Sequence, residues 1–156
     1  MSEGEPRRKL DELLAAFSKM TGAPALATED NGVCLLVFDE RTRVSLFADP
    51  ASSDLIAWSN LGEAPADRIA ETMRALMRAN LFGNGTRGGG LGMMPTNDDI
   101  VLSFRRPLAT LDAEGLQDLI ELAVETAEAL QPVAAGQAAP VAQHNDLPFV
   151  PGAIRG

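Results

Sequence analysis

The chain has 156 residues, of which 46% are hydrophobic and 22% are charged, and this composition predicts one folded domain rather than a disordered segment. Its 13 basic and 22 acidic side chains give a formal net charge of −9 at pH 7, which disfavours nucleic acid because phosphate backbones repel an acidic surface. One cysteine and one histidine are too few for an internal disulfide or a typical zinc site, and no apolar run reaches the roughly 20 residues of a membrane span. We therefore expect no nucleic acid, no membrane and no metal ion among its partners.

The first half of the sequence predicts one helix followed by three strands. Apolar residues recur every three or four positions between 8 and 20, which is the spacing of a one-faced helix. The apolar run at 33–38 follows an Asn-Gly turn signal and predicts a strand that is covered on both faces. Alternating patterns at 43–48 and 54–61, each preceded by a polar turn, predict two more strands. Three strands at such close spacing are typical of an antiparallel meander.

The second half predicts a helix, two short strands and a final helix. The second helix is expected to begin near Pro65 and to end near residue 80, followed by strands at 91–94 and 100–105. Asp112 is a good N-cap for the last helix. The predicted fold is α+β, with an antiparallel five-stranded sheet and three helices in the order α-β-β-β-α-β-β-α. Because prolines replace the periodic pattern after residue 131, we expect a domain at 1–131 and a flexible tail at 132–156.

None of the chemical motifs in the chain predicts an enzyme. The spacing Gly83-x-Gly85-x-x-Gly88 matches the dinucleotide-binding fingerprint, but a helix precedes it and a weak strand follows it, which reverses the required order. We interpret this stretch as a loose loop. Cys34 lies in an apolar run, and the only histidine falls in the predicted tail, so no nucleophile has a base beside it. Acidic pairs fall at predicted turns, where such residues bond their own backbone. We expect no catalytic residue and no cofactor.

The predicted elements carry more apolar surface than one small sheet and its helices can hide. All three helices have an apolar face, and Phe47 and Trp58 fall on sheet faces with no evident cover. Surplus apolar surface of this kind indicates a protein partner, either a second copy of the chain or a client.

Several segments, taken in order, carry a family resemblance. They are Leu13-Leu14-x-x-Phe17, the strand 33–38, the segment 54–62, the helix end at 76–80, Gly90-Leu91-Gly92 and the stretch 105–112. From about residue 10 to residue 130 the chain resembles class I type III secretion chaperones of the Tir-chaperone (CesT-like) family.

This resemblance implies a homodimer of the bacterial cytoplasm that has no enzymatic activity. Such a chaperone binds the N-terminal region of a type III secretion effector and keeps it soluble and export-competent, with the export ATPase as a further partner. The client segment would add strands to sheet edges and place apolar side chains in surface grooves. The resemblance assigns the dimer interface to Ile69, Met73, Leu76 and Met77. Joined to the predicted strand faces, it assigns effector binding to Leu13, Phe17, Leu35, Val37, Val44, Leu46, Phe47, Leu102 and Phe104.

Two alternatives remain open at this point. One is a generic dimeric protein-interaction domain without a role in secretion, and the other is a small-ligand-binding regulatory domain that uses the glycine-rich loop. The predicted tail also contains the short apolar segment 147–151, with the sequence Leu-Pro-Phe-Val-Pro. This segment is either part of a disordered extension or the occupant of an apolar groove when no client is bound.

Overall fold

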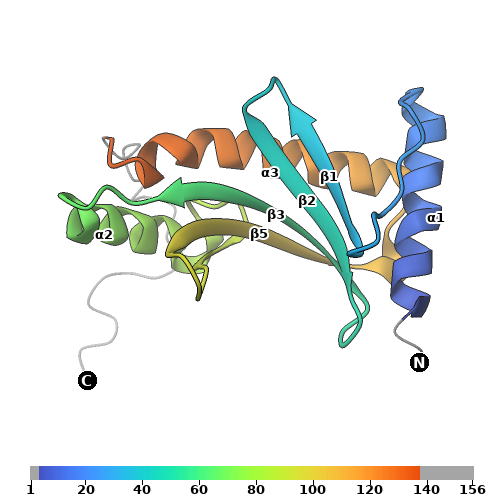
Figure 1. The fold of residues 1–156 in the computed structure, drawn as a ribbon, viewed down its shortest axis with the longest axis horizontal. Coiled ribbons are helices and arrows are strands. Elements are labelled where there is room, and N and C mark those ends of the chain that lie inside the picture. Colours follow the sequence, from blue (N-terminus) through green and yellow to red (C-terminus); the bar gives the residue numbers. More distant parts are fainter. Residues whose placement is uncertain (1–3, 138–156) are drawn as a thin grey trace.

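The helices and strands follow one another in the predicted order (Figure 1). The computed structural model describes residues 4–137, and these hold three α-helices and five β-strands. Their bounds are α1 Gly4–Thr21, β1 Val33–Phe38, β2 Thr42–Asp49, β3 Asp54–Glu63, α2 Ile69–Asn80, β4 Gly90–Met93, β5 Asp99–Pro107 and α3 Ala113–Ala134. Short 3₁₀ helices follow α2 at Leu81–Gly83 and β5 at Leu108–Thr110. Within the described part of the chain, no helix is both long and apolar enough to cross a membrane.

The sheet is antiparallel throughout, with the strand order β1-β2-β3-β5-β4. The first three strands form the predicted meander, and the turn between β1 and β2 places Asp39 and Glu40 at φ values of 50° and 59°. Two consecutive positive φ angles are the signature of the tight hairpin turn whose twist matches that of the strands. Strands β1 and β4 are the two edges, so β1 has a neighbour on one side alone.

The helices pack against one face of the sheet. In Figure 1, α3 runs along the length of the molecule, with α1 at one end and α2 at the other. Alternate residues of the central strands point toward these helices and are almost fully buried, because successive side chains of a strand lie on opposite faces. The strand residues of this core are Cys34, Val44, Leu46, Leu55, Ala57, Leu61, Ile100, Leu102 and Phe104.

Helix α3 begins as predicted but extends farther. The Oδ1 atom of Asp112 accepts a hydrogen bond of 2.8 Å from the backbone N–H of Gly115, which confirms its role as N-cap. The helix continues through Pro132, and Val133 and Ala134 are buried in the core. The domain boundary predicted after residue 131 is therefore wrong by at least three residues, because packing of the last turn outweighs the preference of proline for a helix end. Residues 138–156 of the predicted tail lie outside the described residues.

The second helix starts later than expected. Pro65 and Arg68 are linked by a turn in which the Arg68 N–H donates to the Pro65 carbonyl at 3.0 Å, and α2 begins only at Ile69. Proline thus precedes this helix by one turn instead of occupying its first position.

The glycine-rich loop is packed tightly, contrary to the expectation of a loose loop. A Cβ atom added to Gly85 would lie 2.7 Å from the Cα of Ala79, and one added to Gly89 would lie 2.9 Å from the Phe104 ring. Both distances are far below van der Waals contact. Thr86 is fully buried between these glycines, and its hydroxyl donates to the Gly89 carbonyl. The glycines therefore let the loop approach α2 and β5 closely, which is one of the main uses of the residue.

Candidate functional site

The strand register places a set of residues on the sheet face that points away from the helices. Across the strands, one row joins Val33, Phe47, Ile56 and Arg105, and a second joins Leu35, Ser45, Trp58 and Ser103. A third row pairs Val37 with Arg43 on β1 and β2 and, separately, Asn60 with Val101 on β3 and β5. We call these residues the open face.

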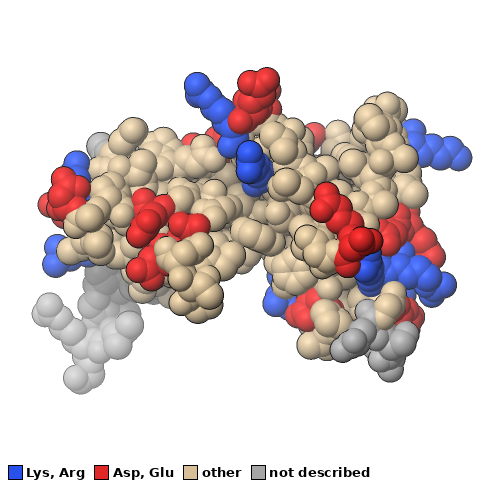
Figure 2. Space-filling view, viewed as in Figure 1, with Lys and Arg blue, Asp and Glu red and all other residues tan. Residues whose placement is uncertain are grey.

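The open face is largely apolar and is not covered by a helix of the described chain. Leu35 is 48% exposed and Val37 is 54% exposed. Phe47, Ile56 and Trp58 are half-buried, yet none of them packs against the core. Strands β1 and β2 pass in front of α3 in Figure 1. Figure 2, drawn from the same side, shows uncharged residues over much of this surface, with charged groups scattered among them in the middle as well as at the ends. An apolar surface of this kind on a sheet is typical of protein contact.

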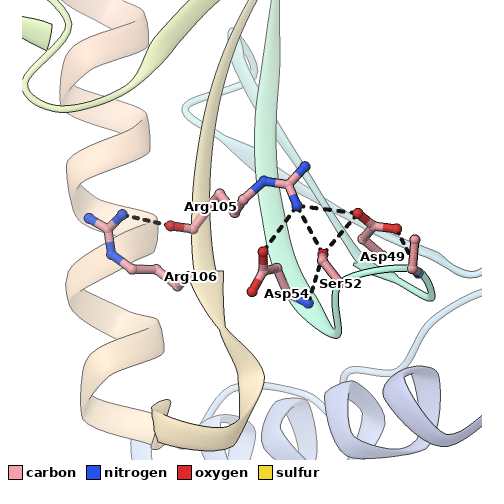
Figure 3. A network of polar contacts seen from close by, with 6 residues as sticks. Asp49, Ser52, Asp54, Arg105 and Arg106 are labelled. Carbon is pink, nitrogen blue, oxygen red and sulfur yellow. Dashed lines mark hydrogen bonds and ion pairs between the residues drawn. The ribbon is translucent and has the colours of Figure 1, made fainter. Parts of the chain in front are cut away.

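A polar network closes one end of the open face (Figure 3). The Nη1 atom of Arg105 donates to Asp49 Oδ2 at 3.2 Å, to Ser52 Oγ at 2.9 Å and to Asp54 Oδ2 at 3.0 Å. Hydrogen bonds from the Ala51 N–H, the Ser52 hydroxyl and Arg105 lower the pKa of Asp49, and the bonds to Asp54 and Asp49 raise the pKa of Arg105. The network fastens the turn between β2 and β3 to β5, so both charges of Asp49 and Asp54 are engaged within the protein.

Arg43 differs from Arg105 because it has no such partners. It is exposed on β2, opposite Val37 in the register, and its side chain makes no hydrogen bond or ion pair with any residue in the described range 4–137. A cation beside exposed apolar side chains is available to an acidic group of whatever covers this face.

Cys34 offers no chemistry at this site. The residue points into the core, and burial, together with the nearby charges of Asp11 and Glu29, raises the pKa of its thiol. The reactive thiolate form is therefore suppressed. Within residues 4–137 there is no group of three or more His, Cys, Asp or Glu side chains that could hold a metal ion.

A model of the Tir chaperone protein (CesT) family matches residues 12–131. The chain belongs to this family. No curated protein matches the sequence. The structure of this CesT-family chain is similar to solved structures at low sequence identity, and these likenesses concern the fold.

Three of these structures show how completely the fold is shared. One is from the HopA1–SchA chaperone–effector complex, with a TM-score of 0.66, 18% identity and coverage of 80% of this chain and 94% of that chain. Another is from the ExsC–ExsE complex, with a TM-score of 0.65, 18% identity and coverage of 85% and 98%. A third is from the Yersinia pestis type III secretion chaperone SycH in complex with a stable fragment of YscM2, with a TM-score of 0.57, 17% identity and coverage of 77% and 98%.

The structure divides the residues that the sequence assigned to effector binding in this CesT-family protein. Leu35, Val37 and Phe47 lie on the open face. The structure contradicts four of the assignments. These side chains lie on the helix-covered face and are at most 2% exposed: Val44, Leu46, Leu102 and Phe104. A shift of one residue along a strand moves a side chain to the other face, so an assignment based on the apolar pattern alone includes residues of both faces.

The α1 residues of the same assignment are also largely unavailable. Leu13 is 9% exposed and belongs to the core, and Phe17 is partly buried and packed against it. Conversely, the assignment omitted Ile56, Trp58 and Val101, which the register places on the open face. The signal for Ile56 and Trp58 was their alternation with the apolar residues Leu55 and Ala57.

The residues assigned to the dimer interface of this CesT-family protein differ in accessibility. Ile69 is 50% exposed and Met77 is 70% exposed, whereas Met73 is partly buried against the core. Leu76 is 4% exposed and belongs to the core of the protomer, so its assignment to an interface is wrong. Two further exposed apolar side chains follow α2 directly, with Leu81 at 44% and Phe82 at 66% exposure.

Proposed function

We propose that this protein is a chaperone that binds the N-terminal region of a type III secretion effector in the bacterial cytoplasm and keeps it soluble and export-competent. Membership of the Tir chaperone protein family supports this function, as does the similarity to proteins solved in chaperone–effector complexes. The observation that carries the proposal is the open face, which places exposed apolar side chains on a rigid sheet without a covering helix.

The binding mode follows from the geometry of the sheet. A client segment that lies across the open face would cover Leu35 and Val37, the most exposed apolar residues of that face. Burying a leucine or valine side chain fully is worth about 1.5–3 kcal/mol, so a few such contacts suffice for stable binding. This mode needs neither a nucleotide nor a metal ion, and it involves no catalysis. The glycine-rich loop, which contacts α2 and β5, has no part in it.

The test begins with the native partner. The full-length chain carrying an affinity tag is purified from its own cells with secretion active, and the most abundant co-purifying protein is identified by mass spectrometry. Its N-terminal segment is then produced, and its dissociation constant is measured with the wild-type chain and with a Leu35→Ser/Val37→Ser variant. We expect the variant to bind at least about tenfold more weakly, which corresponds to about 1.4 kcal/mol.

A matched control separates this surface from general apolar contact. Met20, at the end of α1, is 42% exposed, close to the value for Leu35, and a Met20→Ser change should leave the affinity unchanged. Equal weakening by both variants would contradict the open face as the binding surface. A diffuse set of partners, none held through its N-terminal region, would favour the generic interaction domain instead.

The homodimer is a separate part of the proposal. Ile69 and Met77 are exposed apolar residues on α2, and a second copy that covers them would remove them from water. Light scattering behind a sizing column should give twice the mass of one chain. Met77→Asp places a charge in this contact and should yield monomers. Arg78→Asp, one residue farther along the helix and exposed on a different side, should not.

A further inference from the structure

We propose that residues 146–151 of this chain, with the sequence Asp-Leu-Pro-Phe-Val-Pro, bind the open face when no other protein covers it. The open face presents exposed apolar side chains in a protein that is otherwise rich in charge. Exposed apolar surface of that kind marks a site of contact with another segment or protein. The binding itself does not depend on a client, and only its consequence, competition with a client, rests on the proposed function.

The described chain ends near the β1–β2 turn, on the side of the sheet that the helices cover. Gln137 lines a cavity of about 640 Å³ together with Glu128 of α3, with Asp39 in the turn between β1 and β2, and with Thr42 at the start of β2. Val37 lies two residues before Asp39, and Arg43 directly follows Thr42. Both Val37 and Arg43 belong to the open face. Leu147 is ten residues after Gln137, and an extended chain of that length spans up to about 33 Å. Since a six-residue strand such as β1 is only about 20 Å long, a chain of this length can pass around the β1 edge and reach the open face on β1 and β2.

The charges of the segment and of the open face are complementary. Arg43 has no ion pair within residues 4–137, whereas Arg105 at the other end of the face is bound to Asp49 and Asp54. Asp146 brings a carboxylate directly before the apolar part of the segment. Placing Asp146 at Arg43 therefore puts Leu147 and Phe149 in position to contact the apolar residues around Val37.

The composition of the segment also suits this role. Leu147, Phe149 and Val150 form the densest apolar cluster after Gln137, because the flanking residues are mainly alanine, glycine and polar residues. Pro148 and Pro151 restrict the free chain and so reduce the conformational entropy that is lost on binding.

Trp58 provides a direct measurement, since it is the only tryptophan of the chain and lies on the open face. We compare the fluorescence of the full-length wild-type chain with that of a Leu147→Ser/Phe149→Ser variant, in the absence of any other protein. Loss of the segment should shift the emission of Trp58 to longer wavelength and increase its quenching by acrylamide. The matched control is Val141→Ser/Ile154→Ser, which removes two apolar residues of 138–156 from outside the segment and should change neither property.

A charge exchange tests the orientation. Asp146→Lys should produce the same red shift, and adding Arg43→Glu to it should restore the wild-type emission. A chain ending at Gln137, which retains α3, should behave like the double serine variant.

Three results would overturn the proposal. One is unchanged Trp58 emission in the double serine variant and in the shortened chain, and another is an equal shift in the Val141→Ser/Ile154→Ser control. The third is emission that depends on protein concentration in the shortened chain, which would mean that a second copy covers the face. Client binding separates this proposal from the proposed function: if no effector binds either chain, the function fails while the Trp58 result stands. If an effector binds the double serine variant more tightly than the wild type, the segment also competes with the client.

Discussion

The helix-covered face and the open face of the sheet use neighbouring residues of the same strands in opposite ways. On β2, Leu46 is fully buried while Phe47 stays outside the core, and on β3 the same holds for Ala57 and Trp58. The covered face is built mainly from leucine and smaller side chains together with Phe104, whereas the open face carries Phe47 and Trp58. Phe104 is the only aromatic residue that is fully buried in the described part of the chain. Phe47 and Trp58 are thus placed where a partner can cover them, and aromatic residues are common at protein interfaces.

Leu46→Ala should show the largest effect and give the sharpest contrast between the two faces. Removing this side chain leaves a cavity in the core, so we expect a loss of about 2–5 kcal/mol in the free energy of unfolding. Leu35→Ala makes the same chemical change on the open face, where the side chain is already half in water, and should cost less than about 1 kcal/mol. Urea unfolding followed by circular dichroism measures both. Equal losses would mean that the open face is as well packed as the core.

Gly89→Ala tests the closeness of packing on the covered side. Its new methyl group would lie 2.9 Å from the Phe104 ring and 3.0 Å from the Ser103 carbonyl, so the loop or the ring must move. Overpacking of this kind typically costs about 1–3 kcal/mol. Gly90→Ala, the adjacent position, meets no atom within 4 Å and should stay within about 0.5 kcal/mol of the wild type. If both variants unfold alike in urea, the loop is as loose as the glycine spacing alone suggested.

The sequence could predict the strands and helices but not the faces that they cover. Both Leu46 and Phe47 are apolar, so the alternation on β2 identifies a strand without showing which side the helices occupy. That choice depends on α1 and α3, which are distant in sequence from β2. For the same reason β1, an unbroken apolar run, was expected to be covered on both faces, although it is an edge strand with Leu35 and Val37 exposed.

The other errors have a similar physical origin. Proline at position 132 locally favours the end of a helix, but burial of Val133 and Ala134 carries α3 through it. Glycines at 83–90 locally allow a loose loop, but contacts with Ala79 and Phe104 use their small size for packing. Capping, by contrast, depends on residues within one turn, and the N-cap at Asp112 was predicted correctly.

Asp112→Ala, at the start of α3, should lower the free energy of unfolding moderately. The change removes the hydrogen bond to Gly115 at the first turn of α3, and loss of such a cap costs about 1 kcal/mol, within a range of roughly 0.5–2 kcal/mol. Asp118→Ala, in the middle of the same helix, is the control. Asp118 is exposed and has Glu114 and Glu121 at helical spacing, so its removal should leave stability unchanged or raise it slightly by reducing like-charge repulsion. Equal destabilisation by both variants would show that the loss is not specific to the cap.

Asp49→Asn should have the smallest effect, and it probes the polar end of the open face, where charge rather than packing holds the strands. Because the pKa of Asp49 is lowered in the folded protein, its contribution to stability is fully present above the ordinary aspartate pKa of about 3.9. That contribution is lost as the pH falls through the lowered pKa, where Asp49 itself becomes neutral. The difference between wild type and Asp49→Asn should therefore be largest near neutral pH and should vanish in acid, as measured by urea unfolding at constant ionic strength. Asp67→Asn, an exposed aspartate without an ion pair in residues 4–137, is the control and should show no such trend. A difference that grew on acidification would mean that packing around the β2–β3 turn, and not the bonds to Ala51, Ser52 and Arg105, fixes this end of the open face.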